Sequence, residues 1–212
     1  MEIKALIFDL DGVLVFTDHL HYLAWKEMAD EIGVYFDERI NERLRGVSRM
    51  ASLDIILENY HGKTLGQKEK EKLAEKKNEI YKKLLETMRP EDVAKEVRDT
   101  LQILREKGYL LAIGSSSKNA KFILKKVELL DAFDAISDGT NITRSKPDPE
   151  VFVKAAEFLE VEPKDCMVVE DAYAGIDAAK DGGMYAAGIG GAATYEKTDI
   201  SLETFADLLK YV

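Results

Sequence analysis

Five short apolar runs, separated by longer amphipathic stretches, dominate the hydrophobic pattern of the chain. They lie at residues 5–8, 110–114, 133–137, 166–169 and 186–190. The runs are continuous rather than alternating, as is typical of parallel strands covered on both faces. Helical spacing of apolar residues marks the stretches 92–107, 119–127, 149–159 and 173–181. Because strands and helices alternate, we predict an α/β fold with a doubly wound, mostly parallel sheet of the Rossmann-like kind.

The interval between the first two apolar runs is too long for a single crossover, which needs only about a dozen residues. Residues 19–88 show helical periodicity and no convincing strand, and Pro90 favours a helix boundary just after them. We therefore predict a helical bundle inserted after the first strand. The expected domains are a helical cap at 18–88 and an α/β core formed by 1–17 and 89–212.

Composition and charge narrow the class of protein. The 212 residues are 46% hydrophobic, which is enough to bury a substantial core. The chain has 30 Lys and Arg against 40 Asp and Glu, a net charge of −10, and no basic stripe. We therefore expect no nucleic-acid partner. The apolar start is too short for a signal peptide or a membrane span, and we expect a cytoplasmic monomer with no membrane association. The single cysteine, Cys166, follows the pattern of a buried structural thiol.

Polar residues follow the apolar runs at the positions where ligands collect in open α/β sheets, beyond the carboxyl ends of the strands. They are Asp9 and Asp11 after the first run, Ser115 to Ser117 after the second, Lys146 in the loop after the third, and Glu170 and Asp171 after the fourth. We expect the acids to converge on a hard divalent cation such as Mg²⁺, and the serines and lysine to bind a phosphoryl group. One aspartate can then attack phosphorus and form an aspartyl phosphate, while the other moves a proton.

Each of these features also has a purely structural interpretation. The "DLDG" stretch alone fits a turn, and the serines fit helix caps better than ligand contacts when each is taken singly. A lysine before proline is usually a solvated loop residue, and "EDAYAG" fits the start of a helix. Their occurrence in order at successive strand ends favours a common site.

The stretches "FDLDGVL", "GSSSKN", "SKPDPEVF" and "VVEDAYAGIDAAKDGG" resemble the four motifs of the haloacid dehalogenase superfamily, and the likeness spans the whole chain, including the helical cap. The resemblance implies that Asp9 is the nucleophile, Asp11 the general acid and base, Ser115 a phosphate donor, and Lys146 the cation that steadies phosphate and nucleophile. It further implies Mg²⁺ bound by Asp9, the backbone carbonyl of Asp11, Asp171 and Glu170. Because Asp11 is present, the chain resembles a phosphoryl-transfer member rather than a dehalogenase.

The cap segments "HYLAWKEM", "RLRGVSR" and "KKNEIY" are similar to those of the sugar-phosphate mutases of this superfamily. The likeness implies that Arg49 holds the phosphate that is not transferred, and that His21 and Lys77 bind sugar and position Asp11. The further substrate-binding residues expected are Thr17, Trp25, Arg45, Gly46, Ser116, Ser117, Lys118 and Asn119. Trp25 and His21 also fit simple packing positions on an amphipathic helix. One position departs from the family pattern: Phe16 stands where many relatives have a polar stretch after the first motif, so the contacts at the hinge to the cap are expected to differ.

The activity implied is conversion of β-D-glucose 1-phosphate into glucose 6-phosphate through the 1,6-bisphosphate, with a small phosphorylated sugar as the partner. The alternative is a phosphatase acting on a small sugar phosphate or phosphoglycolate, which needs the same core residues. Two other classes of function fit the sequence less well. A phospho-accepting signalling receiver needs no helical insert, and a binding protein without catalysis would not need all four motifs, so the sequence argues against both.

Overall fold

The computed structural model describes residues 3–44 and 48–212, and the chain divides into two compact units. Residues 1–16 and 88–212 form one of them, the α/β unit, and residues 17–87 form the other, the helical unit. The two boundaries between these units each lie one residue before the position expected from the sequence.

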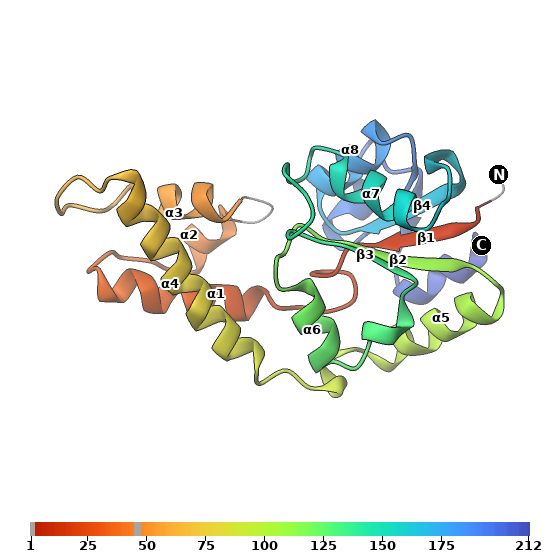
Figure 1. Cartoon of the computed structure of the whole chain (residues 1–212), viewed down its shortest axis with the longest axis horizontal. Helices are drawn as coiled ribbons and strands as arrows, with labels where there is room; N and C mark the ends of the chain where they lie inside the picture. Colours follow the sequence, from red (N-terminus) through yellow and green to blue (C-terminus); the bar gives the residue numbers. More distant parts are fainter. Residues whose placement is uncertain (1–2, 45–47) are drawn as a thin grey trace. The chain divides into compact units, whose positions relative to one another are not determined.

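The α/β unit contains a six-stranded sheet in which every pairing is parallel. Its strands are β1 (Ala5–Phe8), β2 (Leu110–Gly114), β3 (Ala135–Ser137), β4 (Cys166–Glu170), β5 (Tyr185–Ile189) and β6 (Ile200–Leu202). Their order is β3-β2-β1-β4-β5-β6, so the chain winds outwards from β1 in both directions. The helices that alternate with the strands are α5 (Lys95–Glu106), α6 (Ala120–Lys126), α7 (Glu150–Phe158) and α8 (Tyr173–Asp181), with α7 and α8 on one face of the sheet and α5 on the other (Figure 1). The predicted fold class is confirmed.

Two boundaries and one strand differ from the prediction. Strand β3 begins at Ala135 rather than residue 133, because the residues before it form the short 3₁₀ helix η2 (Leu130–Ala132). Helix α5 begins at Lys95, because Pro90–Asp92 form a 3₁₀ turn whose Pro90 carbonyl accepts a hydrogen bond of 2.7 Å from Arg98. Strand β6 was not predicted, because three residues at the edge of a sheet carry too little pattern to be recognised.

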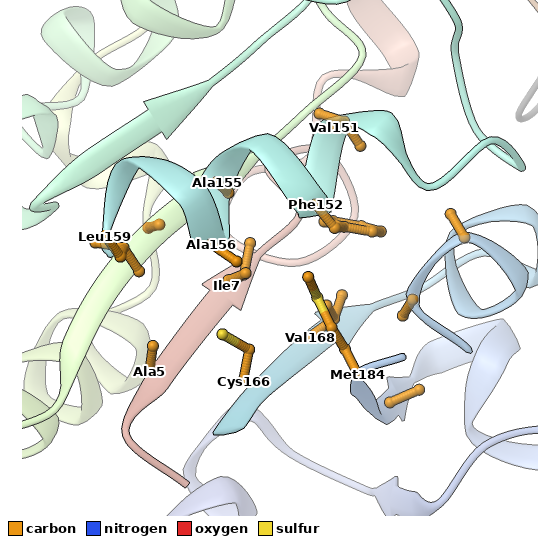
Figure 2. Packing of buried hydrophobic residues seen from close by; sticks show 14 of the residues in the cluster. Ala5, Ile7, Val151, Phe152, Ala155, Ala156, Leu159, Cys166, Val168 and Met184 are labelled. Carbon is orange, nitrogen blue, oxygen red and sulfur yellow. The ribbon is translucent and has the colours of Figure 1, made fainter. Parts of the chain in front are cut away.

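The core explains why the strand sequences do not alternate. On β1, Ala5 and Ile7 face α7 and pack with Phe152, Val168 and other buried side chains (Figure 2). On the opposite face Phe8 contacts Phe133 edge-on, with ring centroids 6.2 Å apart. Since both faces are covered, every residue of β1 is fully buried. A glycine ends β2 where Phe152 packs closest, because a Cβ at Gly114 would lie 2.4 Å from that ring.

The helical unit consists of α1 (Asp18–Glu31), α2 (Glu38–Glu42), α3 (Arg49–Leu57) and α4 (Gln67–Leu85). Side-chain caps begin two of these helices: Asp37 accepts a hydrogen bond of 2.8 Å from the Ile40 N–H, and the Ser48 hydroxyl accepts one from Ala51. Helices α1 and α3 both pack against α4, and each of the three helices carries a fully buried side chain: Met28 in α1, Leu53 in α3 and Leu85 in α4. The described part of this unit contains no strand, as expected.

Across the described ranges 3–44 and 48–212, no helix has the length and apolar character that crossing a membrane requires.

The buried position of Ile7 yields a stability prediction. Replacing Ile7 with Ala is expected to lower the free energy of unfolding by about 2–5 kcal/mol, and Ile7→Val by about 0.5–1.5 kcal/mol, because the side chain is fully buried between α7 and the sheet. Urea unfolding followed by far-UV circular dichroism measures this. Leu110→Ala, at the exposed start of β2, is the control and should change stability little. A loss below about 1 kcal/mol for Ile7→Ala would contradict the packing described.

Candidate functional site

The strand register places the polar residues of the site at one edge of the sheet. Phe8, the last residue of β1, lies opposite Ile113 of β2 and Val169 of β4. The next residue, Asp9, donates its N–H to the Val169 carbonyl at 3.0 Å, so the chain is still held to β4 where its first carboxylate appears. Asp9, the first residue after β1, and Glu170, the last residue of β4, therefore lie at neighbouring strand ends.

Lys146 joins these two strand ends from the loop between β3 and α7. Its ammonium lies 2.5 Å from Asp9 Oδ1 and 2.9 Å from Glu170 Oε2, and 4.6 Å from the centre of the Phe152 ring. The side chain is only 11% exposed, so it is not the solvated loop lysine of the structural interpretation. Burial disfavours its charge, but the carboxylates of Asp9 and Glu170 outweigh burial and raise the pKa of Lys146, which keeps it cationic.

Negative charge exceeds positive charge around this lysine. Burial, with the nearby carboxylate of Asp9, raises the pKa of Glu170 to about 8. Burial, with the carboxylates of Asp9 and Asp11, raises the pKa of Asp171 to about 6. Both shifts mean that these carboxyl groups bind protons unusually readily unless another cation neutralises them.

The same carboxylates fit a metal ion. Asp9, Glu170 and Asp171 each offer an oxygen, and the three oxygens lie within 4.8 Å of one another. A set of carboxylate oxygens suits a hard divalent cation, and its uncompensated negative charge favours one. Asp11 is not among the three carboxylates, so the structure brings together three of the four expected metal-binding residues by their side chains.

Two glycines make room for the acids. Gly12 has a φ of +89°, and a Cβ there would lie 2.2 Å from Asp171 Oδ2. A Cβ at Gly175, in the first turn of α8, would lie 2.1 Å from the Glu170 carboxyl carbon. The tight turn that contains Gly12 is closed by its N–H bond of 2.7 Å to the Val15 carbonyl, and this turn carries Asp11. Sequence reasoning missed the role of both glycines, although their places beside the acids in "DLDG" and "EDAYAG" were a signal.

The serine loop after β2 is held by its own hydroxyls. The Ser117 N–H donates to Ser115 Oγ at 3.2 Å, and the Asn119 N–H donates to Ser117 Oγ at 3.1 Å, so two of the hydroxyls accept local backbone bonds. They do not cap the next helix as the structural interpretation suggested, because the residue before α6 is Asn119. Ser115 is 3% exposed and Lys118 lies on the surface. The Ser116 hydroxyl is buried and has no hydrogen-bond partner among the described residues.

The helical unit has a polar cluster of its own. Lys77 is 3% exposed, and its ammonium lies 2.8 Å from His21 Nδ1, 4.8 Å from the Trp25 ring centre and 4.6 Å from the Tyr81 ring centre. Tyr81 stacks on His21 and shares a hydrogen bond of 2.9 Å with the Thr17 hydroxyl. Burial and the nearby cations Lys77 and Arg49 hold the pKa of His21 well below its usual value, so its imidazole is neutral.

Thus Thr17, His21, Trp25 and Lys77, which the sequence suggested separately, lie in one cluster. Trp25 is a core residue that also offers a ring face to the lysine. The packing interpretation is confirmed, and contact of Trp25 with a sugar stays a prediction. Tyr81 was missed, although its place four residues after Lys77 puts both on one helix face.

Arg49 begins α3 and reaches towards α4. Its Nη2 donates to Asn78 Oδ1 at 3.0 Å, and its Nη1 lies 3.9 Å from Glu75 Oε2. Its side chain is 32% exposed, so part of the guanidinium is open to solvent. Two other expected substrate-binding residues, Arg45 and Gly46, lie outside the described residues.

Comparison with known proteins agrees with this geometry. Residues 3–183 match the haloacid dehalogenase-like hydrolase family. Beta-phosphoglucomutase of Bacillus subtilis (strain 168) is 41% identical over 206 residues, which cover 97% of this chain and 91% of that protein. A phosphorylated carbohydrates phosphatase of Thermotoga maritima is 30% identical over 183 residues, which cover 85% of this chain and 82% of that protein.

Among solved structures, beta-phosphoglucomutase from Clostridium difficile superposes with a TM-score of 0.89 at 35% identity, covering 99% of this chain and 95% of that one. The fold and the family expected from the four motifs are confirmed. The chain belongs to the haloacid dehalogenase-like hydrolase family.

Proposed function

We propose that the protein is a Mg²⁺-dependent beta-phosphoglucomutase that converts β-D-glucose 1-phosphate into glucose 6-phosphate through an aspartyl phosphate on Asp9. The observation that carries the proposal is the Lys146 ammonium bound to Asp9 and Glu170 at once, with Asp171 beside them. Such a site can hold an anionic phosphoryl group against a carboxylate nucleophile, which would otherwise repel it.

In the proposed reaction Asp9 attacks phosphorus, a P–O bond to its carboxylate forms, and the P–O bond to the sugar breaks. Asp11 gives its proton to the leaving sugar oxygen, and in the return step it accepts a proton from the hydroxyl that attacks the aspartyl phosphate. Asp9, Asp171, Glu170 and the Asp11 carbonyl would hold Mg²⁺, which supplies positive charge to the phosphoryl oxygens when bound. Lys146 and Ser115 orient the same oxygens.

A mutase must bind two phosphates, and we assign the second to Arg49. The N–H donors of its guanidinium form a fork that suits a phosphate. The hydrogen bond from Nη2 to Asn78 fixes one side of the guanidinium. The Lys77–His21 pair adds sugar-binding donors from a cluster that is already ordered. The likeness to the Bacillus subtilis mutase over nearly the whole chain supports this choice of substrate.

A phosphatase is the second candidate. The relative from Thermotoga maritima and the fructose-1-phosphate phosphatase YqaB of Escherichia coli, 29% identical over 183 residues, are named for hydrolysis. The outcome depends on whether water or a sugar hydroxyl reaches the aspartyl phosphate.

The product of turnover distinguishes the two candidates. With Mg²⁺, β-D-glucose 1-phosphate and a trace of the 1,6-bisphosphate, we expect glucose 6-phosphate to form much faster than free phosphate, because a sugar hydroxyl accepts the phosphoryl group. Coupled assays for both products measure this, with Asp9→Asn as the inactive control. Free phosphate alone would reject the mutase and favour the phosphatase.

Arg49 gives a second prediction. Its replacement by Ala removes charged hydrogen bonds to a phosphate, worth about 1.5–3 kcal/mol, so kcat/KM for the hexose phosphate should fall by about ten- to a hundredfold. Phosphoenzyme formation from acetyl phosphate, which has no second phosphate, should stay unchanged. Arg49→Lys is the matched control. Its kcat/KM should lie between those of the wild type and Arg49→Ala, since lysine keeps the charge but loses the forked pair of N–H donors. An unchanged kcat/KM in Arg49→Ala would remove this residue from the site.

Metal binding should depend on pH in a definite direction. The raised pKa values of Glu170, about 8, and Asp171, about 6, belong to the metal-free protein. As pH falls from 8, Glu170 gains a proton first and Asp171 later, and a cation must displace these protons. The apparent Mg²⁺ affinity should therefore fall with decreasing pH, by up to about tenfold per unit for each proton displaced.

Calorimetric titration of Mg²⁺ in buffers of different ionisation enthalpy measures both the affinity and the number of protons released. Lys146→Met is an informative comparison, because loss of the ammonium should raise both carboxyl pKa values and steepen the dependence. An affinity that is constant between about pH 6 and 8 would contradict the assignment of Glu170 as a ligand.

A further inference from the structure

The position of Lys146 depends on the loop that carries it. Its own contacts join β1 and β4, yet its backbone belongs to the connection between β3 and α7, which also contains Pro147 and Pro149. A long lysine side chain places its ammonium accurately only when its backbone is fixed. The contacts that fix this connection therefore decide where the ammonium lies.

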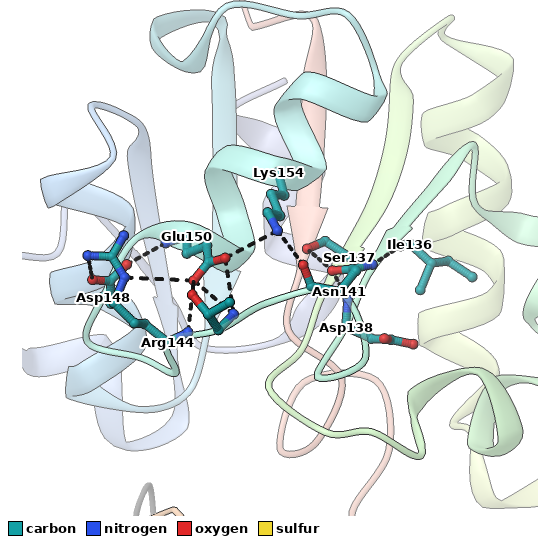
Figure 3. Close-up of polar contacts among 9 residues, drawn as sticks. Ile136, Ser137, Asp138, Asn141, Arg144, Asp148, Glu150 and Lys154 are labelled. Atoms are coloured by element: carbon teal, nitrogen blue, oxygen red, sulfur yellow. Dashed lines mark hydrogen bonds and ion pairs between the residues drawn. The ribbon is translucent and has the colours of Figure 1, made fainter.

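The Glu150 carboxylate closes the loop around Lys146. Glu150 is the first residue of α7, and its oxygens accept the Thr143 N–H at 3.0 and 3.1 Å, the Thr143 hydroxyl at 2.9 Å and the Arg144 N–H at 2.8 Å. One side chain thus ties the middle of the connection to the first residue of α7 (Figure 3). In the sequence, Lys146 lies between these two points. The Glu150 side chain is 12% exposed.

A neighbouring carboxylate supports the same closure. Asp148 Oδ1 accepts the Glu150 N–H at 3.0 Å, and Asp148 Oδ2 lies 3.0 Å from Arg144 Nη1. Arg144 is therefore bound through its backbone to Glu150 and through its side chain to Asp148. Burial opposes the charge of Glu150, but the N–H groups of Arg144 and Thr143 outweigh it and lower its pKa to about 2.

Lys154 connects this closure to the end of β3. Its ammonium lies 3.2 Å from Glu150 Oε1 and also donates to the Asn141 carbonyl. The Asn141 side-chain oxygen accepts from the Ser137 hydroxyl and the Asp138 N–H, both at 3.2 Å. The loop is therefore fastened to the last residue of β3 and to the first residue of α7, and Figure 3 shows both groups of contacts joined by Lys154.

We propose that Glu150 is a positioning residue for Lys146: its carboxylate fixes the loop so that the lysine ammonium stays between Asp9 and Glu170. Among the described residues, no hydrogen bond or ion pair joins Glu150 to Lys146, Asp9 or Glu170. In this proposal Glu150 does not take part in the chemistry. The inference rests on the proposed function in one respect, the role of Lys146 in phosphoryl transfer to Asp9.

The first test reads the position of Lys146 without catalysis. In Glu150→Gln, a neutral side chain of equal size, we expect acylation of Lys146 by acetic anhydride to increase by about three- to tenfold, because loosening the loop exposes a buried ammonium. Thr143→Val removes one donor to the same carboxylate and should act in the same direction. Peptide mass spectrometry measures the reaction at Lys146 and, as internal standards, at exposed lysines.

The control is Glu157→Gln, an exposed acid on the same helix outside the contacts described. It should leave the acylation of Lys146 unchanged. Equal acylation of Lys146 in the wild type, Glu150→Gln and Thr143→Val would overturn the proposal.

The second test is a double-mutant cycle on phosphoenzyme formation from radiolabelled acetyl phosphate and Mg²⁺. Glu150→Gln should slow this step by about ten- to a hundredfold, the effect of misplacing a group by about 1 Å. In a Lys146→Ala background the same substitution should change the rate less than about twofold, because the group that it positions is gone. An equal slowing in both backgrounds would show a general structural effect and overturn the proposal.

The two tests separate this inference from the proposed function. Acetyl phosphate contains no sugar, so a protein that forms no glucose 6-phosphate can still show the cycle. If Lys146→Ala forms too little phosphoenzyme to measure, the acylation result decides.

Discussion

The Lys146 ammonium lies between the carboxylates of Asp9 and Glu170, in a place where water has little access. Burying one of these charges alone would cost several kcal/mol, whereas together they neutralise part of one another. Three separate parts of the chain must therefore meet: the ends of the adjacent strands β1 and β4, and the connection before α7. The parallel register supplies the two strand ends, and the contacts of Glu150 and Lys154 hold the connection.

The neutralisation is incomplete, and its incompleteness suits the proposed chemistry. One ammonium lies among the carboxylates of Asp9, Glu170 and Asp171. Burial, together with the remaining repulsion between the carboxylates, raises the pKa values of Glu170 and Asp171. In the proposed function, this surplus of negative charge favours binding of a divalent cation before that of a phosphate. The small residues Gly12 and Gly175 let the acids crowd together, so the backbone is shaped to maintain this charge density.

Much of the fold and of the α/β site could be predicted because both depend on local patterns. Continuous apolar runs indicated β1, β2, β4 and β5. The rule that ligands gather at carboxyl strand ends predicted that Asp9, Lys146 and Glu170 share a site, from their places after these runs in the sequence. Strand β6 was not predicted, because its position depends on pairing with β5 rather than on a pattern in its own three residues.

Other features depend on tertiary packing, which single-sequence patterns do not contain. The place of Tyr81 against His21 and Thr17 follows from how α1 packs on α4. The bonds from Thr143 and Arg144 to Glu150 require a loop shape that no spacing indicates. Likewise, the sequence favoured helix caps for the serines taken singly, whereas the structure shows Ser115 and Ser117 accepting backbone bonds within the loop before α6.

The insertion of the helical unit has a consequence for the diversity of the family. Residues 17–87 enter and leave the α/β unit within one connection, between β1 and α5, so the length of this segment does not affect the pairing of any two strands. Lengthening such an excursion costs little conformational entropy, about 0.6 kcal/mol for each doubling of a flexible loop. Evolution can therefore exchange the helical segment while the sheet and its charged edge persist.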